Sequence, residues 1–126
     1  MDQTIEGYSL DKSHHWTGHL INMTSQQWLS EADVDRSIWW HILVVIIPDN
    51  VDWKKNATLW INGRSNDSNM PTNKDEDIVL SAALAMGTGT ITGALFQIPN
   101  EHIVFSSDPK QQVCSYAACT LLKLES

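Results

Sequence analysis

Basic residues are scarce in this chain of 126 residues. Lysine and arginine number 8 against 15 aspartate and glutamate residues, and the formal net charge is -7. Proteins recognise a phosphate backbone mainly through positive charge, so bulk electrostatics exclude a nucleic-acid binder. Long apolar runs are missing too. The longest, Ile38–Ile47, has about half of the ~20 residues needed to cross a bilayer, and we expect no membrane span.

The chain also has few cysteines and no leader-like start. Its two cysteines, Cys114 and Cys119, would lie about 7.5 Å apart along a helix axis, beyond easy disulfide reach. Their spacing therefore leaves the redox compartment open. Met1–Gly7 has neither a basic nor an apolar region of the kind found in signal peptides, so we expect no secretory signal on this chain.

Enough apolar material is present for one folded unit. Hydrophobic residues make up 42% of the chain, charged residues only 18%, and there are six tryptophans. Such a composition buries enough surface to offset chain entropy, and the length suits a single domain spanning residues 1–126. The tryptophans are expected in the core and at strand edges, while a carbohydrate platform stays an open alternative.

The most regular stretch predicts a strand. Ile42–Ile47 is apolar and mostly β-branched without alternation, and it stops at Pro48, which favours a strand buried on both faces. Before it, Tyr8–Asn22 is expected to form a less regular strand. Ser30–Asp35 is acidic and short, and it is expected to form a turn or loop.

The second half of the chain predicts a strand, loop, helix and strand. Ala57–Asn62 and Thr90–Ile98 have strand character, and Ile78–Met86 is helical, with Gly87 as the expected C-cap. Thr72 and Asp75 have the spacing of a capping box before this helix. The helix is apolar nearly all round, so we expect it to be buried. This order predicts a βαβ unit with two parallel strands and a right-handed crossover.

No residue pattern predicts a cofactor or metal site. Gly87–Gly93 resembles a dinucleotide fingerprint, but its glycines follow a helix and precede a strand, which is the reverse of the required order. His14, His15 and His19 lack a carboxylate or cysteine at a matching ligand spacing. We therefore expect no metal and no cofactor.

Two other polar residues, His41 and Ser65, are candidates for a catalytic role. His41 lies within the apolar run, where a hydrogen-bonded structural histidine is expected. Ser65 is the nearest approach to a nucleophile elbow, but Asp67 occupies the place where that turn requires glycine. We expect Ser65 to be an ordinary loop serine.

Three sequons are candidates for glycosylation. They start at Asn22, Asn56 and Asn66, and such sites suit a secreted protein. Acceptor asparagines need exposure. Because Asn66 lies in a predicted loop while Asn22 and Asn56 lie in or beside predicted strands, Asn66 is the preferred candidate.

Several ordered motifs resemble one known family. They are Asn22–Leu29, Asp33–Arg36, Trp39–His41, Ile47–Asn50, Leu59–Asn66 and Gln97–Asn100. Across residues 8–108 the chain resembles the N-terminal portion of the PhoPQ-activated pathogenicity-related protein family, which includes the autocrine proliferation repressor of social amoebae.

The resemblance implies an α/β fold, here an incomplete α/β-hydrolase-like sheet of N-terminal strands with one βαβ crossover. It also implies an exported or secreted family with hydrolase-like activity in some members and growth-regulating or virulence-linked roles in others. In such a fold the loop after Ala57–Asn62 supplies an oxyanion-hole N–H. By position this loop comprises Gly63, Arg64, Ser65 and Asn66.

The chain also departs from the family pattern. Arg64 stands where the family has its second glycine, Ser37 stands where it commonly has proline, and residues 109–126 diverge. The family's nucleophile, acid and triad histidine lie beyond the resembling segment, so we expect no catalytic residue in this chain.

Three hypotheses follow from the sequence. In the first, the chain is a truncated N-terminal segment without catalysis of its own, acting if at all in binding or growth regulation. In the second, function belongs to a longer secreted hydrolase acting on peptides or esters. In the third, the chain is an independent acidic binding module that exposes Trp16, Trp28 and Trp53. No specific partner is indicated, although unpaired sheet edges favour self-association.

Overall fold

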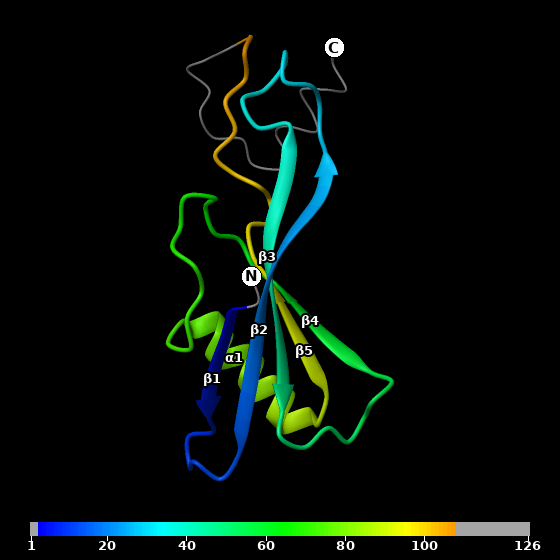
Figure 1. The fold of residues 1–126 in the computed structure, drawn as a ribbon, viewed down its shortest axis with the longest axis vertical. Helices are drawn as coiled ribbons and strands as arrows, with labels where there is room; N and C mark the ends of the chain where they lie inside the picture. Colours follow the sequence, from blue (N-terminus) through cyan, green and yellow to red (C-terminus); the bar gives the residue numbers. More distant parts are fainter. Residues whose placement is uncertain (1–2, 108–126) are drawn as a thin grey trace.

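A computed structural model describes residues 3–107 of the chain. Cys114, Cys119 and the divergent residues 109–126 lie outside the described part. Residues 3–107 form five strands and one helix: β1 (Gln3–Tyr8), β2 (His15–Gln27), β3 (Ile38–Pro48), β4 (Ala57–Ile61), α1 (Glu76–Thr88) and β5 (Ile91–Leu95). The strand order in the single sheet is β1-β2-β3-β5-β4, and the fold is α/β (Figure 1).

The sheet is mixed. β4 and β5 run parallel and are joined through α1, which confirms the predicted strand, helix and parallel strand. The other three pairs, β1 with β2, β2 with β3 and β3 with β5, are antiparallel. Both neighbours of β3, which contains the Ile42–Ile47 run, are therefore antiparallel to it, and the parallel pairing is confined to β4 and β5.

The predicted strand over Tyr8–Asn22 is two strands. Tyr8 ends β1, a turn follows, and β2 begins only at His15. The turn is held by Asp11, whose carboxylate accepts hydrogen bonds from the hydroxyl groups of Ser9 and Ser13. These bonds, with that from the Ser13 amide, lower the pKa of Asp11 far below its usual range. The prediction of one strand is wrong because the mainly polar segment Ser9–Ser13 forms a turn between the two strands.

β3 is buried fully on one face only. Along it Ile42, Val44 and Ile46 are buried under α1, whereas Leu43, Val45 and Ile47 between them are half-buried. In residues 3–107 a single helix lies against the sheet, packed on β3, β5 and β4 (Figure 1). The prediction of a strand buried on both faces is thus wrong for the described part of the chain.

The helix is longer and less buried than the sequence predicts. It runs to Thr88, and its C-cap is Gly89 rather than Gly87. Gly89 has a φ of 64°, a conformation that side chains rarely adopt, and a Cβ there would lie 2.5 Å from Asp52 Oδ2, so glycine is favoured at this position. On the outer face Val79 and Leu80 are 47% and 44% exposed, which corrects the expectation of burial all round.

The predicted capping box is wrong, because the N-cap of the helix is Asp75, without a side-chain capping bond, and not Thr72. The amide and hydroxyl of Thr72 both donate to the Asp75 carboxylate, closing a turn, and Asp75 itself is the N-cap of a helix that begins at Glu76. The acidic side chains of Glu76 and Asp77 then occupy the first turn, where the helix dipole favours them.

The described residues form two hydrophobic clusters. The larger lies between α1 and the sheet and includes Trp16, Val44 and Phe96. The smaller lies where the long β2–β3 hairpin extends beyond the other strands, and it joins Val34 and Trp39 to Ile103. Trp16 is only 3% exposed, so it cannot serve the exposed binding surface proposed with Trp28 and Trp53.

Candidate functional site

The loop that follows β4 lies against the chain that follows β5. The backbone amide of Asn62 donates to Leu95 O at 2.8 Å, that of Gln97 to Gly63 O at 2.8 Å and that of Ile98 to Asn62 O at 3.2 Å. These bonds extend the β4–β5 pairing past the ends of both strands. They fix the loop at the carboxyl end of the parallel pair, which is where open α/β sheets commonly place ligands.

Arg64 adopts a backbone conformation that suits glycine. Its φ is 97°, in the left-handed region that costs a non-glycine residue about 1–3 kcal/mol. The structure thus gives a physical reason for a glycine at this place in the family pattern. The side chain stabilises the arrangement: one guanidinium nitrogen donates to Asp75 Oδ1 at 2.9 Å, and the guanidinium lies 5.6 Å from the centre of the Phe96 ring.

Asp75 connects this loop to the helix N-terminus. The pKa of its carboxyl is lowered, first by the hydrogen bond from the Thr72 amide and then by the Thr72 hydroxyl and the Arg64 guanidinium. The carboxylate is therefore firmly ionised at neutral pH. It holds the loop after β4 against the start of α1.

Asn66 is buried. It is 6% exposed, its amide N–H donates to Glu101 O at 2.7 Å, and its side-chain Nδ2 donates to Asn100 Oδ1 at 2.9 Å. This overturns the basis on which Asn66 was preferred for glycosylation, because its side chain is engaged inside the protein. The two other sequon asparagines, Asn22 and Asn56, are exposed.

Asn100 completes this connection. It is 1% exposed, and its Nδ2 donates to the backbone carbonyl of Trp40 in β3. One buried amide thus joins the loop after β4, the segment after β5 and the central strand. Leaving a buried polar group unpaired costs free energy, so the two hydrogen bonds of Asn100 favour this arrangement of the three segments.

His41 is a hydrogen-bonded structural histidine, as the sequence predicted. Its Nδ1 lies 2.9 Å from Gln97 O, and its Nε2 lies 2.8 Å from Ser25 Oγ. A carbonyl only accepts, so Nδ1 carries a proton and donates to Gln97 O, while Nε2 shares a hydrogen bond with the Ser25 hydroxyl. Ser25 stands at a β-bulge between Thr24 and Gln26, which turns its side chain toward the histidine.

Gln97 closes the network. Its backbone has a φ of 65°, and its side-chain Oε1 accepts from the Ile42 amide at 2.9 Å, replacing a sheet partner beyond the end of β5. Four segments far apart in the sequence therefore meet at one end of the sheet: Ser25, Trp40–His41, Gly63–Asn66 and Gln97–Asn100. The sequence predicts a hydrogen-bonded role for His41 and indicates Gly63–Asn66 and Gln97–Asn100 through the family motifs, but no local pattern predicts that these segments meet.

Ser65 and the histidines near the N-terminus have local roles. Ser65 Oγ accepts the Asp67 amide at 3.2 Å and lies 3.4 Å from His102 Nδ1, so it closes a turn. His14 pairs with Asp49 at 3.5 Å and His15 with Glu6 at 3.7 Å. Among residues 3–107 no three histidine, cysteine or acidic side chains converge as metal ligands. No helix within this range is long and apolar enough to cross a membrane.

Comparison with known proteins supports the motifs on which the resemblance rests. The sequence model of the PhoPQ-activated pathogenicity-related protein family matches residues 5–117, so the chain belongs to this family. It is 30% identical over 98 residues to the autocrine proliferation repressor protein A of Dictyostelium discoideum. That match covers 77% of this chain but 19% of the relative. No solved structure matches.

Proposed function

We propose that the chain is the N-terminal, sheet-forming part of an α/β-hydrolase-like protein of this family, and that Gly63, Arg64, Ser65 and Asn66 form its oxyanion loop. By itself this part lacks a catalytic nucleophile, and its own role is binding or growth regulation. The second candidate is that activity belongs to a longer, secreted relative acting on peptides or esters.

One observation carries the oxyanion assignment. In the loop after β4, the backbone amides of Asn62 and Asn66 donate to carbonyl groups, whereas those of Gly63, Arg64 and Ser65 have no protein partner among the described residues. An oxyanion is stabilised by such free, fixed N–H groups. In α/β-hydrolases one of these donors comes from the loop between the third strand and the first helix, and the loop between β4 and α1 has the same setting.

The strand order supports the same proposal. In the order β2-β3-β5-β4, β3 is antiparallel to both of its neighbours, and β5 lies between β3 and β4. The sheets of α/β-hydrolases begin with this order. This is an analogy of fold, so the functional argument depends on the loop and its free amides.

A hydrolysis assay separates the two candidates. The purified chain and a longer product of the same locus, read past Ser126 and containing a Gly-x-Ser-x-Gly element, are each given p-nitrophenyl acetate. We expect turnover by the longer protein alone, because the triad acts only as an assembled unit. Turnover by the 126-residue chain above the buffer rate would contradict the first proposal. A downstream sequence without the element would contradict the second.

A further inference from the structure

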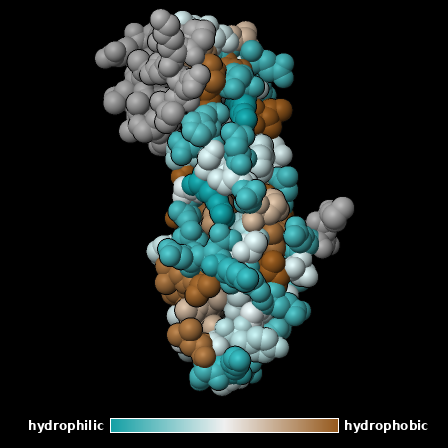
Figure 2. Space-filling view, turned by 90° about the vertical axis from the view of Figure 1, so that its left-hand side faces the viewer, coloured by the Kyte–Doolittle hydropathy of each residue, from teal (hydrophilic) through white to brown (hydrophobic). Residues whose placement is uncertain are grey.

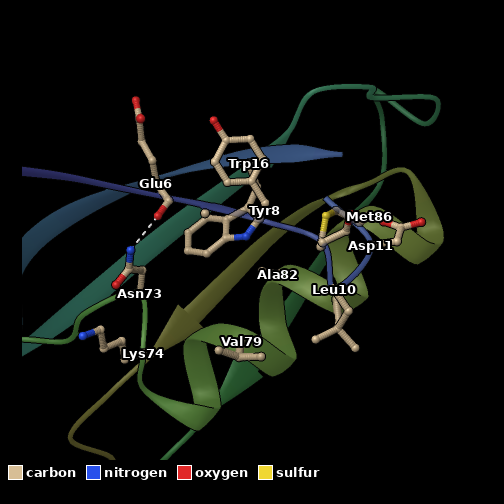
Figure 3. Close-up of a pocket in the computed structure, with 13 residues that line it drawn as sticks. Glu6, Tyr8, Leu10, Asp11, Trp16, Asn73, Lys74, Val79, Ala82 and Met86 are labelled. Atoms are coloured by element: carbon tan, nitrogen blue, oxygen red, sulfur yellow. Dashed lines mark hydrogen bonds between the residues drawn. The ribbon is translucent and has the colours of Figure 1, made fainter. Parts of the chain in front are cut away.

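An open apolar hollow separates the β1–β2 hairpin from the outer flank of α1. Its volume is about 860 Å³, and its walls are mainly hydrophobic. Figure 3 shows Tyr8, Leu10 and Trp16 on the hairpin side and Val79, Ala82 and Met86 on the helix side. The hollow lies away from the polar network around His41, whose residues do not line it.

The helix wall of the hollow has the pattern of a packing surface. Val79, Ala83 and Met86 recur at intervals of four and three residues, so they form one stripe along the flank of α1. Val79 is 47% exposed although it is apolar. Hydrophobic surface interrupts the polar surface in the lower half of Figure 2, which views the side of the molecule that carries β1. Exposed apolar surface that lines a hollow and has a polar rim is typical of an interaction site.

The shape of the hollow favours a second helix as its occupant. A stripe at helical spacing, with a small residue at its centre, presents a groove into which the side-chain ridge of another helix packs at about 8–10 Å between axes. The same face of the sheet already carries α1, so a neighbouring helix would continue one layer over β1 and β2.

The charges at the rim restrict the partner further. Glu6 and Asp11 lie on the hairpin side, while Lys74 lies before the start of α1. Neither carboxylate has a lysine or arginine partner in the described part of the chain; Glu6 pairs with His15, and Asp11 accepts bonds from two serines. A helix with basic residues beside its apolar stripe complements this side of the rim.

We propose that this hollow is the docking site of an amphipathic helix supplied by the remainder of the family protein, whose apolar stripe packs on Val79, Ala83 and Tyr8. The relative from Dictyostelium extends far beyond the match, which covers 19% of its length, so it has ample chain to supply the helix. The inference rests on the proposed function in one respect, that this chain is one part of a larger protein.

Peptide binding tests the proposal. Overlapping peptides of about 20 residues, long enough for about 30 Å of helix, are made from the part of the Dictyostelium relative outside the matched segment. Binding to the 126-residue chain is followed by fluorescence anisotropy, and perturbation of the Met86 methyl signal reports on the site. We expect at least one helix-forming peptide to bind with a dissociation constant below about 100 μM.

Two variants with matched exposure locate the binding. Val79→Glu introduces a charge into the hollow, and Leu80→Glu introduces the same charge on the next residue, which is 44% exposed and does not line the hollow. We expect Val79→Glu to weaken the peptide about tenfold or more and Leu80→Glu to change it less than about twofold. Near-UV circular dichroism of both variants controls for folding.

Three results would overturn the proposal. They are the absence of binding by every peptide up to about 1 mM, equal effects of the two glutamate substitutions, and binding of laurate in place of any peptide. The last would identify a pocket for an acyl chain. None of these results depends on hydrolysis, so failure of the helix proposal is distinguishable from failure of the proposed hydrolase function, which the turnover assay tests.

Discussion

Asn66 and Asn100 join two loops through one buried hydrogen bond of 2.9 Å between Nδ2 of the first and Oδ1 of the second. Asn100 then donates to the carbonyl of Trp40. The loop proposed to hold an oxyanion is thereby fastened to the central strand β3. Loop geometry at this end of the sheet depends on two amide side chains that are 34 residues apart in the sequence.

Replacing Asn100 with aspartate should destabilise the protein. The carboxylate still accepts from Asn66, but it cannot donate to Trp40 O, and a charge is buried opposite a carbonyl. We expect a loss of about 3 kcal/mol in the free energy of unfolding, measured by urea titration of the tryptophan signal. Asn56→Asp, at an exposed position, is the control and should change it by less than about 0.5 kcal/mol. Equal effects would show that the buried amide network is not stabilising.

Two substitutions of Arg64 separate the free energy of its backbone strain from that of its side-chain contacts. Arg64→Gly and Arg64→Ala both remove the pairing with Asp75, but only glycine relieves the φ of 97°. We expect the glycine variant to be more stable than the alanine variant by about 1 kcal/mol, the reverse of the usual order. Urea unfolding of both proteins gives the difference. A more stable alanine variant would be inconsistent with a left-handed residue 64.

Asp75 should make the stability of the protein depend on pH. Its pKa is lowered in the folded state, chiefly by the Thr72 amide. Its contribution is therefore complete above the ordinary aspartate pKa of about 4 and is lost as the pH falls through the lowered value. Asp75→Asn should flatten the decline in unfolding midpoint below about pH 4. If the unfolding midpoint depends on pH equally in both proteins, Asp75 is not the cause of the acid destabilisation.

Glycosylation should follow exposure. When the chain is expressed through a secretory pathway, we expect glycans at Asn56 and Asn22 and none at Asn66, whose amide donates to Asn100. The mass lost on glycosidase treatment should be smaller for Asn56→Gln than for the wild-type chain. For Asn66→Gln it should equal the loss of the wild-type chain. An unchanged mass of the secreted wild-type chain on treatment would contradict the prediction altogether.

The β4 edge should promote self-association. β1 and β4 are the outer strands of the described sheet, and β4 carries no charge, with Leu59 56% exposed. Uncharged open edges invite pairing with another chain. We expect Leu59→Lys to lower the apparent mass of the purified chain in sedimentation velocity, and Leu80→Lys on α1 to leave it unchanged. A wild-type chain that is monomeric at about 100 μM would contradict this expectation.

The local elements follow largely from the sequence. The β-branched run of β3, the strand character around Leu59 and the apolar segment of α1 place the βαβ unit, because local side-chain periodicity reflects helix and strand geometry directly. The ordered short motifs also indicate the family, which the match to residues 5–117 shows.

Tertiary structure decided which of those residues are buried and how they are paired. The apolar run predicts the same burial for Leu43 and Val45 as for Val44. Only Val44 is fully buried, because one face of β3 is covered in the described part of the chain. Gly87 and Gly89 are equally good C-caps in the sequence, but the folded chain takes the left-handed conformation at Gly89 and leaves Gly87 inside the helix. Asn66 has a loop sequence and a buried amide because its partner lies across the fold. Hydrogen bonds and contacts between distant segments carry no local period, so these features arise only when the sheet order brings the segments together.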